Sequence, residues 1–383
     1  MMIKCDVFIH STSEHIAQLC TGFSLLESQK RIQLTYNLHP YTRYGKHPLK
    51  HKDPYALQGM FVVLNDKITI YYDTTDGENL LQEALEVADL YLKRSYREDA
   101  IPGDYRDMVF PLGLNYEVYT DGINKLDFAR FILNKQALKS PKQMIKSLMG
   151  NLNLKYQPAI SAMHTPPARS QEPRVLFMAR TWDPEDHPAG FTPELAENWR
   201  MICNEVNETR ASVISLLRKN LGDRFYGGFS PGGHAVANYK SCLLPDTRAA
   251  EKKSYINTLR QYPICIASTG LYNSIGWKLG EYVAFSKAIV SEALYYEVPG
   301  GFSKNKNYLD FKTADQCVEQ TYILLEDKGT RETMMESNYQ YYKNYLSPDK
   351  LIWHSLECAL SLVASPWAPL LPGSLNKDKI TRD

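Results

Sequence analysis

Apolar and polar residues alternate along the first 112 residues in runs typical of short strands separated by helices. Strands are predicted at 4–10, 32–38, 60–64, 67–72 and 107–112. The pair Asn65-Asp66 fits a turn that joins the third and fourth of these runs in a hairpin or short reversal. Apolar residues at helical spacing predict helices over 11–26 and 79–96. This alternation builds a layered α/β domain.

The same alternation returns after residue 173 and predicts a second α/β domain. Its predicted strands are 174–179, 224–229, 264–267 and 288–290. Its predicted helices are 193–221 (broken once), 249–261, 278–285, 313–327, 330–345 and 348–363. The glycine-rich stretch 227–233 predicts a mobile loop.

Between the two halves, residues 141–172 lose their periodicity and gain proline, as in an interdomain linker. We therefore predict a first domain at 1–157, a linker at 158–173, a second domain at 174–347 and a final helix with its tail at 348–383. The fold class is α/β, with two Rossmann-like domains that face a cleft.

Charge and composition narrow the classes of function. Lys plus Arg total 44 and Asp plus Glu total 43, which gives a net charge of +1 and argues against a dedicated nucleic-acid-binding protein. The most basic stretch, 44–52, is predicted to be a solvated loop, or a contact for an anionic acceptor.

Seven cysteines show neither C-x-x-C pairs nor metal-ligand spacing, so no zinc site or disulfide framework is predicted. No signal peptide or membrane-spanning stretch is predicted, and a reducing cytoplasm fits best.

The segment 264–292 carries the most specific chemistry. A buried strand leads into a small-residue loop and a helix that starts near Gly276, and this is where open α/β sheets bind ligands. Backbone N–H groups and the helix dipole favour a phosphate there. Lys278 stands in the first turn, where the dipole disfavours a cation, and this indicates an anionic partner. Glu281 lies on the same face; in the alternative interpretation, both side chains simply point to water.

This segment resembles the donor site of GT-B glycosyltransferases, especially the retaining family-four bacterial enzymes with two glutamates spaced E-x7-E. The resemblance implies that Glu281 binds the ribose of a nucleotide. Asn273 stands where the first glutamate contacts the sugar, and it can form hydrogen bonds but cannot act as a carboxylate.

Three further stretches follow the order of the same family. Residues 88–95 with 107–116 resemble the end of the acceptor domain, and 174–180 resembles the strand that opens the donor domain. The resemblance places Arg180 at the diphosphate, although 181–184 lack the usual Lys-Gly. Residues 338–348 and the terminal helix resemble the segment that crosses back to the first domain. Together the matches span 88–360.

The predicted donor site follows from these matches. Its residues are Arg180, Thr269, Gly270, Asn273, Ser274, Gly276, Trp277, Lys278 and Glu281. No Asp-x-Asp triplet occurs in the chain, so we expect Arg180, Lys278 and backbone N–H groups to stabilise the leaving diphosphate without a metal. No cofactor is expected beyond the nucleotide-sugar donor.

Two residues of the first domain are candidates for a general base. Asp73 follows a strand within 73–77, although Asp and Thr before Gly also make an ordinary turn and helix cap. His15 lies beside the first strand–helix loop, with His10 as a second option, and either histidine can instead be structural.

The sequence thus predicts a hexosyltransferase-like enzyme that moves a sugar from a nucleotide-sugar donor to a glycan or lipid-linked acceptor in bacterial surface polysaccharide synthesis. The apolar tail 366–372 is expected either to pack on the protein or to make a peripheral contact with the inner face of the membrane. The loop 227–233 is expected either to order over the donor phosphates or to form a surface turn. The alternatives are a sugar-nucleotide epimerase of the same fold and a GT-B-like binding protein without turnover, which Asn273 favours.

Overall fold

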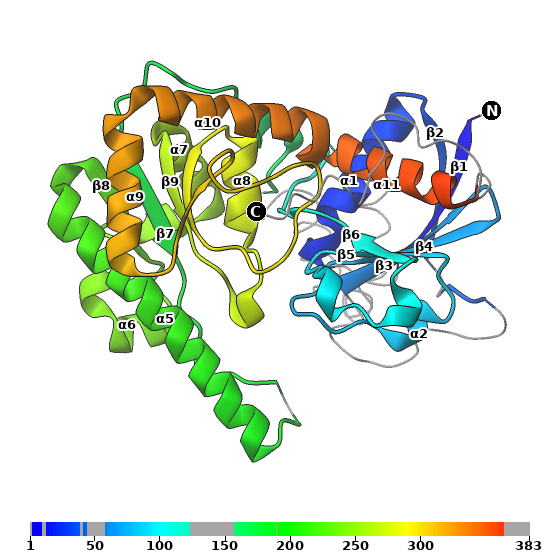
Figure 1. Cartoon of the computed structure of the whole chain (residues 1–383), viewed down its shortest axis with the longest axis horizontal. Helices are drawn as coiled ribbons and strands as arrows, with labels where there is room; N and C mark the ends of the chain where they lie inside the picture. Colours follow the sequence, from blue (N-terminus) through cyan, green and yellow to red (C-terminus); the bar gives the residue numbers. More distant parts are fainter. Residues whose placement is uncertain are drawn as a thin grey trace, which may run out of the picture. The chain divides into compact units, whose positions relative to one another are not determined.

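The computed structural model describes residues 2–9, 13–38, 41–43, 58–122, 157–188 and 190–363. The chain divides into two compact units (Figure 1). Unit 1 comprises Met1–Met163, Tyr296–Gly301 and Lys343–Asp383, and unit 2 comprises His164–Tyr295 and Phe302–Tyr342. Each unit contains its own β-sheet, so the α/β fold class with two sheet domains is confirmed.

Unit 1 holds a six-stranded sheet in the order β2-β1-β3-β4-β5-β6. Its strands are β1 (Ile3–Phe8), β2 (Ile32–Asn37), β3 (Gly59–Leu64), β4 (Ile68–Asp73), β5 (Leu90–Lys93) and β6 (Val109–Pro111). Strand β3 is antiparallel to both neighbours, and the other pairs are parallel. Asn65 and Asp66 have φ angles of 49° and 59°, as the tight turn of a hairpin requires, so the predicted hairpin is confirmed.

One face of this sheet is covered by α1 (Ala17–Ser28) and the terminal helix α11 (Pro348–Val363), which lie side by side (Figure 1). Gly22 permits their close approach, because a Cβ there would lie 2.2 Å from the carbonyl oxygen of Pro348. Leu351, Ile352 and other residues of α11 join the core of unit 1. The prediction that the last helix crosses back to the first domain is confirmed.

The other face of the sheet packs an aromatic cluster against the short helix α2 (Gln82–Leu85). The predicted helix over 79–96 is wrong, because only α2 is helical and Leu90–Lys93 forms β5. All four residues of β5 are buried between β4 and β6. A strand covered on both faces carries a continuous apolar run rather than an alternating one, so its pattern merged with that of the helix before it.

Unit 2 holds a parallel sheet in the order β11-β10-β9-β7-β8. Its strands are β7 (Val175–Ala179), β8 (Phe225–Phe229), β9 (Ile264–Ala267), β10 (Ala288–Glu292) and β11 (Leu309–Phe311). Its helices are α5 (Pro193–Leu221), α6 (Gly233–Asn238), α7 (Lys252–Gln261), α8 (Trp277–Ala284), α9 (Ala314–Glu326) and α10 (Lys328–Tyr341). This is a doubly wound sheet whose strand order reverses between β7 and β9.

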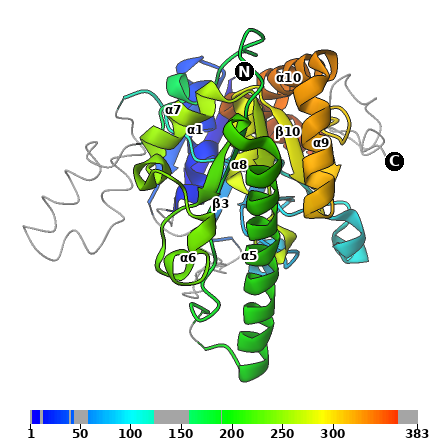
Figure 2. The same cartoon turned by 90° about the vertical axis from the view of Figure 1, so that its left-hand side faces the viewer.

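Helix α5 is one unbroken helix of 29 residues, so the predicted break in 193–221 is wrong (Figure 2). Thr192 caps its first turn by accepting from the N–H of Leu195, and Pro193 occupies the first position. No proline or glycine interrupts the interior, which explains why the helix continues to Leu221.

The glycines of 227–233 are mostly not loop residues. Gly227 and Gly228 belong to β8, and Gly233 begins α6, so the prediction of a mobile loop over 227–233 is wrong for the strand part. A Cβ at Gly227 would lie 2.2 Å from the carbonyl oxygen of Phe177 in β7. Gly227 is therefore required for the packing of β8 against β7.

The chain enters unit 2 after Met163, within the predicted linker, and part of the stretch 141–172 lies outside the described residues. The predicted domain 174–347 is interrupted, because Tyr296–Gly301 belongs to unit 1. Within unit 1, the N–H of Glu297 donates to the carbonyl of Tyr96 (2.9 Å), and Oε1 of Glu297 accepts from the N–H of Glu98 (2.8 Å).

All seven cysteines are buried, and none is paired in a disulfide in the structure. Among the described residues, no helix has both the length and the hydrophobicity to cross a bilayer.

Candidate functional site

The carboxyl ends of β7 and β9 form the point at which the strand order of unit 2 reverses. Arg180 directly follows β7, and Ser268 and Thr269 directly follow β9. Helices leave such a point toward opposite faces of the sheet, and the crevice between them is where doubly wound folds bind ligands. The structure thus places Arg180 and Thr269, both predicted from the sequence, on either side of this reversal.

Arg210 of α5 joins the two sides. Its guanidinium donates to the carbonyl of Arg180 (2.7 Å), the carbonyl of Thr269 (2.7 Å) and Oγ of Ser268 (3.0 Å). The residue is 7% exposed, and burial lowers its pKa to about 10, which still leaves it charged at neutral pH. The two strand ends are therefore tied together by one buried cation.

Glu292, the last residue of β10, adds a carboxylate to this cluster. Its Oε2 accepts from the N–H (2.6 Å) and the Oγ1 (3.1 Å) of Thr269. Burial raises the pKa of Glu292, while these two hydrogen bonds and the charge of Arg210 oppose that rise. Thr269 is consequently held by side chains of helix α5 and strand β10.

The loop that follows Thr269 is a tight turn. The N–H of Gly270 donates to the carbonyl of Ser274 (2.8 Å), and Tyr272 and Asn273 have φ angles of 55° and 57°. Asparagine tolerates this left-handed conformation better than most residues. Asn273 is exposed at the tip, while Ser274 is buried.

Helix α8 begins after this loop, with Gly276 at its N-cap and Trp277 and Lys278 in the first turn. The ammonium of Lys278 lies 3.9 Å from the ring centroid of Tyr255 in α7. Burial lowers the pKa of Lys278 to about 8, and the charge of Glu281 counteracts part of that shift. A cation held in this state gains from a neighbouring anion, which fits a phosphate-binding role.

Glu281 is 2% exposed, so the alternative that both side chains point to water is wrong for Glu281. Its Oε1 accepts from Nζ of Lys252 (2.6 Å), and its Oε2 accepts from the hydroxyl of Tyr255 (2.7 Å). Burial alone would raise the pKa of Glu281, but the charges of Lys252 and Lys278 and these hydrogen bonds bring it below its usual value. Glu281 is thus a buried, charged acceptor.

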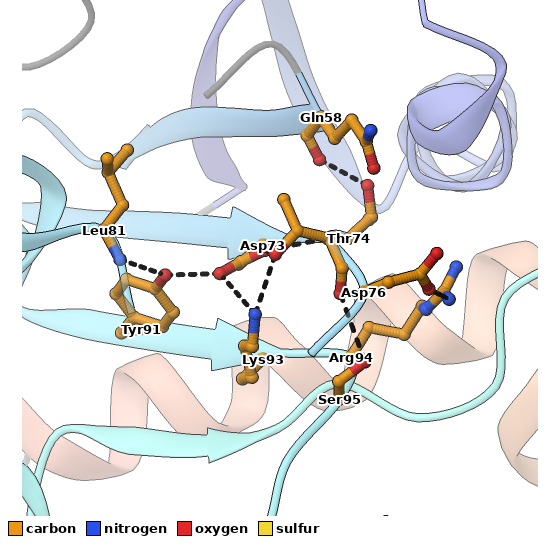
Figure 3. A network of polar contacts seen from close by, with 10 residues as sticks. Gln58, Asp73, Thr74, Asp76, Leu81, Tyr91, Lys93, Arg94 and Ser95 are labelled. Atoms are coloured by element: carbon orange, nitrogen blue, oxygen red, sulfur yellow. Dashed lines mark hydrogen bonds and ion pairs between the residues drawn. The ribbon is translucent and has the colours of Figure 1, made fainter. Parts of the chain in front are cut away.

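Asp73 of unit 1 lies in a polar network at the carboxyl ends of β4 and β5 (Figure 3). Its Oδ1 accepts from the N–H (2.8 Å) and Oγ1 (2.6 Å) of Thr75. Its Oδ2 accepts from Nζ of Lys93 (3.0 Å) and from the hydroxyl of Tyr91. The side chains of Lys93 and Asp73 are 0% and 2% exposed. This arrangement favours a structural role, and the base role of Asp73 stays a prediction.

The same network fixes the turn after β4. Arg94 pairs with Asp76, and Oγ of Ser95 donates to the carbonyl of Thr75 (3.2 Å) (Figure 3). The turn 73–77 is therefore held at its start and along its length.

His15 lies in the short 3₁₀ helix Glu14–Ile16, which Ser13 caps. Its backbone carbonyl accepts from Nδ2 of Asn115 (3.2 Å), which follows β6. Because β1, β4 and β6 point the same way, His15, Asp73 and Asn115 follow the same edge of the sheet. His10 and the basic stretch 44–52 lie outside the described residues.

The structure brings the predicted donor residues into two adjoining groups within unit 2. Arg180 and Thr269 meet through Arg210, and Lys278 and Glu281 meet at Tyr255. The sequence reasoning missed several partners of these residues: Asn207, Arg210, Lys252, Tyr255 and Glu292. For Asn207 and Arg210 the sequence contained one signal, because α5 carries these polar residues within an otherwise apolar buried stripe. That stripe consists of Cys203, Asn207, Arg210, Ile214, Leu217 and Leu221.

No group of three or more His, Cys, Asp or Glu side chains suited to a metal ion occurs among the described residues. The metal-independent chemistry expected from the sequence stays a prediction.

No protein-family model matches the chain, and no curated protein shows significant sequence similarity to it. Among solved structures, it is similar to the C-terminal domain of a glycosyl transferase group 1 family protein, LpcC, from Francisella tularensis. That match has 11% identity and a TM-score of 0.33, and covers 48% of this chain and 95% of that domain.

Two longer structures are also similar to the chain. The pneumococcal O-GlcNAc transferase GtfA, in complex with UDP and GlcNAc, matches at 12% identity and a TM-score of 0.35, over 85% of this chain and 65% of that one. A provisionally assigned UDP-N-acetylglucosamine 2-epimerase from Listeria monocytogenes matches at 9% identity and a TM-score of 0.34, over 76% and 64%. The chain thus spans less than two thirds of either protein, and at these scores neither identifies its family.

Proposed function

We propose that the chain is a nucleotide-sugar-dependent glycosyltransferase of the GT-B type, in which unit 2 binds the donor and unit 1 the acceptor. The observation that carries this proposal is the group of cations and fixed backbone groups at the strand-order reversal of unit 2. Arg180, Thr269 and the start of α8 with Lys278 all belong to it.

The chemistry of transfer requires that negative charge on the departing nucleoside diphosphate be stabilised. Arg180 and Lys278 supply two cations, and the N-terminus of α8 supplies backbone N–H groups and a favourable dipole. These groups can bind a diphosphate directly, so we propose that transfer needs no metal ion.

The ribose is assigned to Glu281 in this proposal. An ionised carboxylate accepts about four hydrogen bonds, and Lys252 and Tyr255 account for two within the described part of the chain. Asn273, exposed at the loop tip, is proposed to contact the sugar through its carboxamide. A hexose from the donor would pass to a glycan or lipid-linked hydroxyl, with His15 as the favoured base because Asp73 is buried and paired.

A second candidate is a protein that binds a nucleotide sugar without turnover. The observation that favours it is Asn273, which stands where the resembling enzymes carry a carboxylate. Nucleotide binding is common to both candidates, so only turnover separates them.

The test begins with thermal shift measurements against a panel of nucleoside diphosphates in the presence of EDTA. We expect one diphosphate to raise Tm, because a ligand that binds only the folded state stabilises it. The matching sugar nucleotide should then release that diphosphate when glycan acceptors are added. Binding that requires manganese overturns metal independence, and stabilisation by no diphosphate overturns the donor site. Interconversion of the sugar nucleotide without release indicates an epimerase, and binding without any reaction indicates the second candidate.

A peripheral membrane contact through 366–372 is also proposed, although this stretch lies outside the described residues. Co-sedimentation with anionic liposomes should decrease when the chain is cut after Ala364. Equal binding of both chains removes the membrane contact.

A further inference from the structure

In unit 2, buried side chains of α5 form hydrogen bonds to backbone groups at the point where the strand order reverses. Arg210 bonds the carbonyls of Arg180 and Thr269, which lie 30 and 59 residues away in the sequence. We infer that Arg210 is the positioning residue of the donor site and sets the spacing of the two strand-end loops that receive the diphosphate. This inference rests on the proposed nucleotide-sugar site and adds to it a residue that acts through Arg180 and Thr269.

The geometry of the guanidinium suits this role. Its Nε, Nη1 and Nη2 each donate to a different acceptor, and these acceptors belong to the loops after β7 and β9. A planar fork fixes directions as well as distances, whereas a lysine ammonium offers one flexible point charge. Lysine at 210 would keep the charge and lose the simultaneous contacts.

Asn207, one turn earlier on the same face of α5, supports the first loop at a second point. Its Oδ1 accepts from the N–H of Trp182 (2.9 Å), and its Nδ2 donates to the carbonyl of Trp182 (2.7 Å). The guanidinium carbon of Arg180 lies 4.0 Å from the ring centroid of Trp182. Arg180 is thus positioned through its own carbonyl and through the ring beneath its side chain.

Glu292 completes the support on the other loop. It holds the N–H and hydroxyl of Thr269, while Arg210 holds the carbonyl of the same residue. Thr269 is therefore held at its N–H, its hydroxyl and its carbonyl. A loop fixed in this way presents its remaining groups to a ligand without a further ordering cost.

The same helix provides a matched control. Arg218, two turns after Arg210, donates to the carbonyls of Gly227 (2.7 Å), Leu243 (2.6 Å) and Ser241. Like Arg210, Arg218 bonds three acceptors, and it links a strand to a distant loop. These acceptors lie in β8 and in the segment before α7, away from the point where the strand order reverses. Loss of Arg218 should affect folding without affecting nucleotide binding.

The experiment compares Arg210→Lys with Arg218→Lys. Calorimetric titration, below the Tm of each variant, uses the nucleoside diphosphate that stabilises the wild type most. We expect Arg210→Lys to weaken diphosphate affinity about tenfold or more, the change that about 1.4 kcal/mol produces. Arg218→Lys should leave affinity within about twofold, whatever its Tm. Wild-type affinity in a folded Arg210→Lys, or equal losses in both variants, would overturn the inference.

Two further variants cover a failure of Arg210→Lys to fold. Ser268→Ala removes the acceptor of Nε and should weaken affinity a few-fold with little change in Tm. In Arg210→Ala, added guanidinium at millimolar concentration should restore part of the affinity, which a purely structural role does not predict. An unaffected Ser268→Ala together with no rescue contradicts the positioning role. If the wild type binds no nucleoside diphosphate at all, the proposed function fails first and the role of Arg210 falls with it.

Discussion

Asp73 in unit 1 and Glu281 in unit 2 are both buried carboxylates paired with a lysine, yet their surroundings differ. Asp73 accepts from both polar groups of Thr75, from Tyr91 and from Lys93, whose side chain is 0% exposed. Glu281 accepts from Tyr255 and from Lys252, whose side chain is 25% exposed.

The difference lies in how much of each carboxylate's hydrogen-bonding capacity the protein itself uses. Asp73 uses about the full hydrogen-bonding capacity of a carboxylate within the protein, so it fixes the turn after β4. Glu281 accepts two hydrogen bonds within the described residues, one of them from Lys252, and its own side chain is 3% exposed. Full pairing therefore argues against a chemical role, although burial alone does not.

The largest effect is expected when the ion pair between Lys93 and Asp73 in unit 1 is broken. Lys93→Met should lower the free energy of unfolding by about 3–5 kcal/mol, because it leaves the charge of Asp73 buried without its cation. Urea denaturation measures the loss. The double variant with Asp73→Asn should recover much of it. A loss below about 1 kcal/mol for the single variant would show that the pair contributes little.

Glu281→Gln probes the other carboxylate. Removing a charged acceptor from the ribose should weaken nucleoside diphosphate binding by about 1.5–3 kcal/mol, or roughly ten- to a hundred-fold, with the fold retained. Titration calorimetry measures the affinity, and folded Lys93→Met should bind as the wild type does. Unchanged affinity in a folded Glu281→Gln removes Glu281 from the site.

The pKa of Lys278 predicts opposite pH trends for binding and stability. With a folded pKa of about 8, caused by burial, and an ordinary value of 10.5, Lys278 loses its proton in the folded state first. Affinity for the diphosphate should therefore fall above pH 8, by up to about tenfold per pH unit. The free energy of unfolding should rise between pH 8 and 10.5, because the unfolded chain binds more protons there.

Titration and urea denaturation from pH 7 to 10 test both trends. Lys278→Met should bind weakly at every pH and lose the wild-type slope. Persistence of that slope in the variant would assign it to another group, with Lys252, Glu281 and Arg210 as the charged neighbours.

The smallest effects should come from the two tyrosines. Tyr91→Phe and Tyr255→Phe each remove one hydroxyl donor to a buried carboxylate, and each should cost about 1–2 kcal/mol of unfolding free energy. Only Tyr255→Phe should also weaken nucleotide binding, a few-fold, because only Glu281 is assigned to the ligand. If Tyr91→Phe weakens binding equally, the distinction between the two carboxylates fails.

The sequence pointed to candidate site residues that lie within one stretch. Lys278 and Glu281 were proposed because 264–292 contains a strand, a loop, a helix and another strand in immediate succession. Arg210 was missed because the two carbonyls that it joins are 30 and 59 residues away. Lys252 was missed for the same reason, since its pair with Glu281 depends on how α7 packs against α8.

Errors in the predicted fold have a related cause. Apolar runs located most strands, but the short β11 was not predicted, and 79–96 was predicted as one helix because β5 is buried on both faces and lacks an alternating pattern. The glycines at 227 and 228 suggested a loop, whereas the close approach of β7 explains at least Gly227. Such a close approach depends on a neighbouring strand, which the glycine content of the stretch does not reveal.

Because Tyr296–Gly301 belongs to unit 1 and interrupts the sequence of unit 2, neither unit is encoded by a continuous part of the gene. A fragment ending at Met163 would lack α11 and expose the apolar face of α1. Replacing 164–342 in one block by the corresponding part of a related gene would also remove the residue that bonds Tyr96 and Glu98. Exchange of unit 2 by recombination therefore requires two separate insertions, one on each side of this short segment.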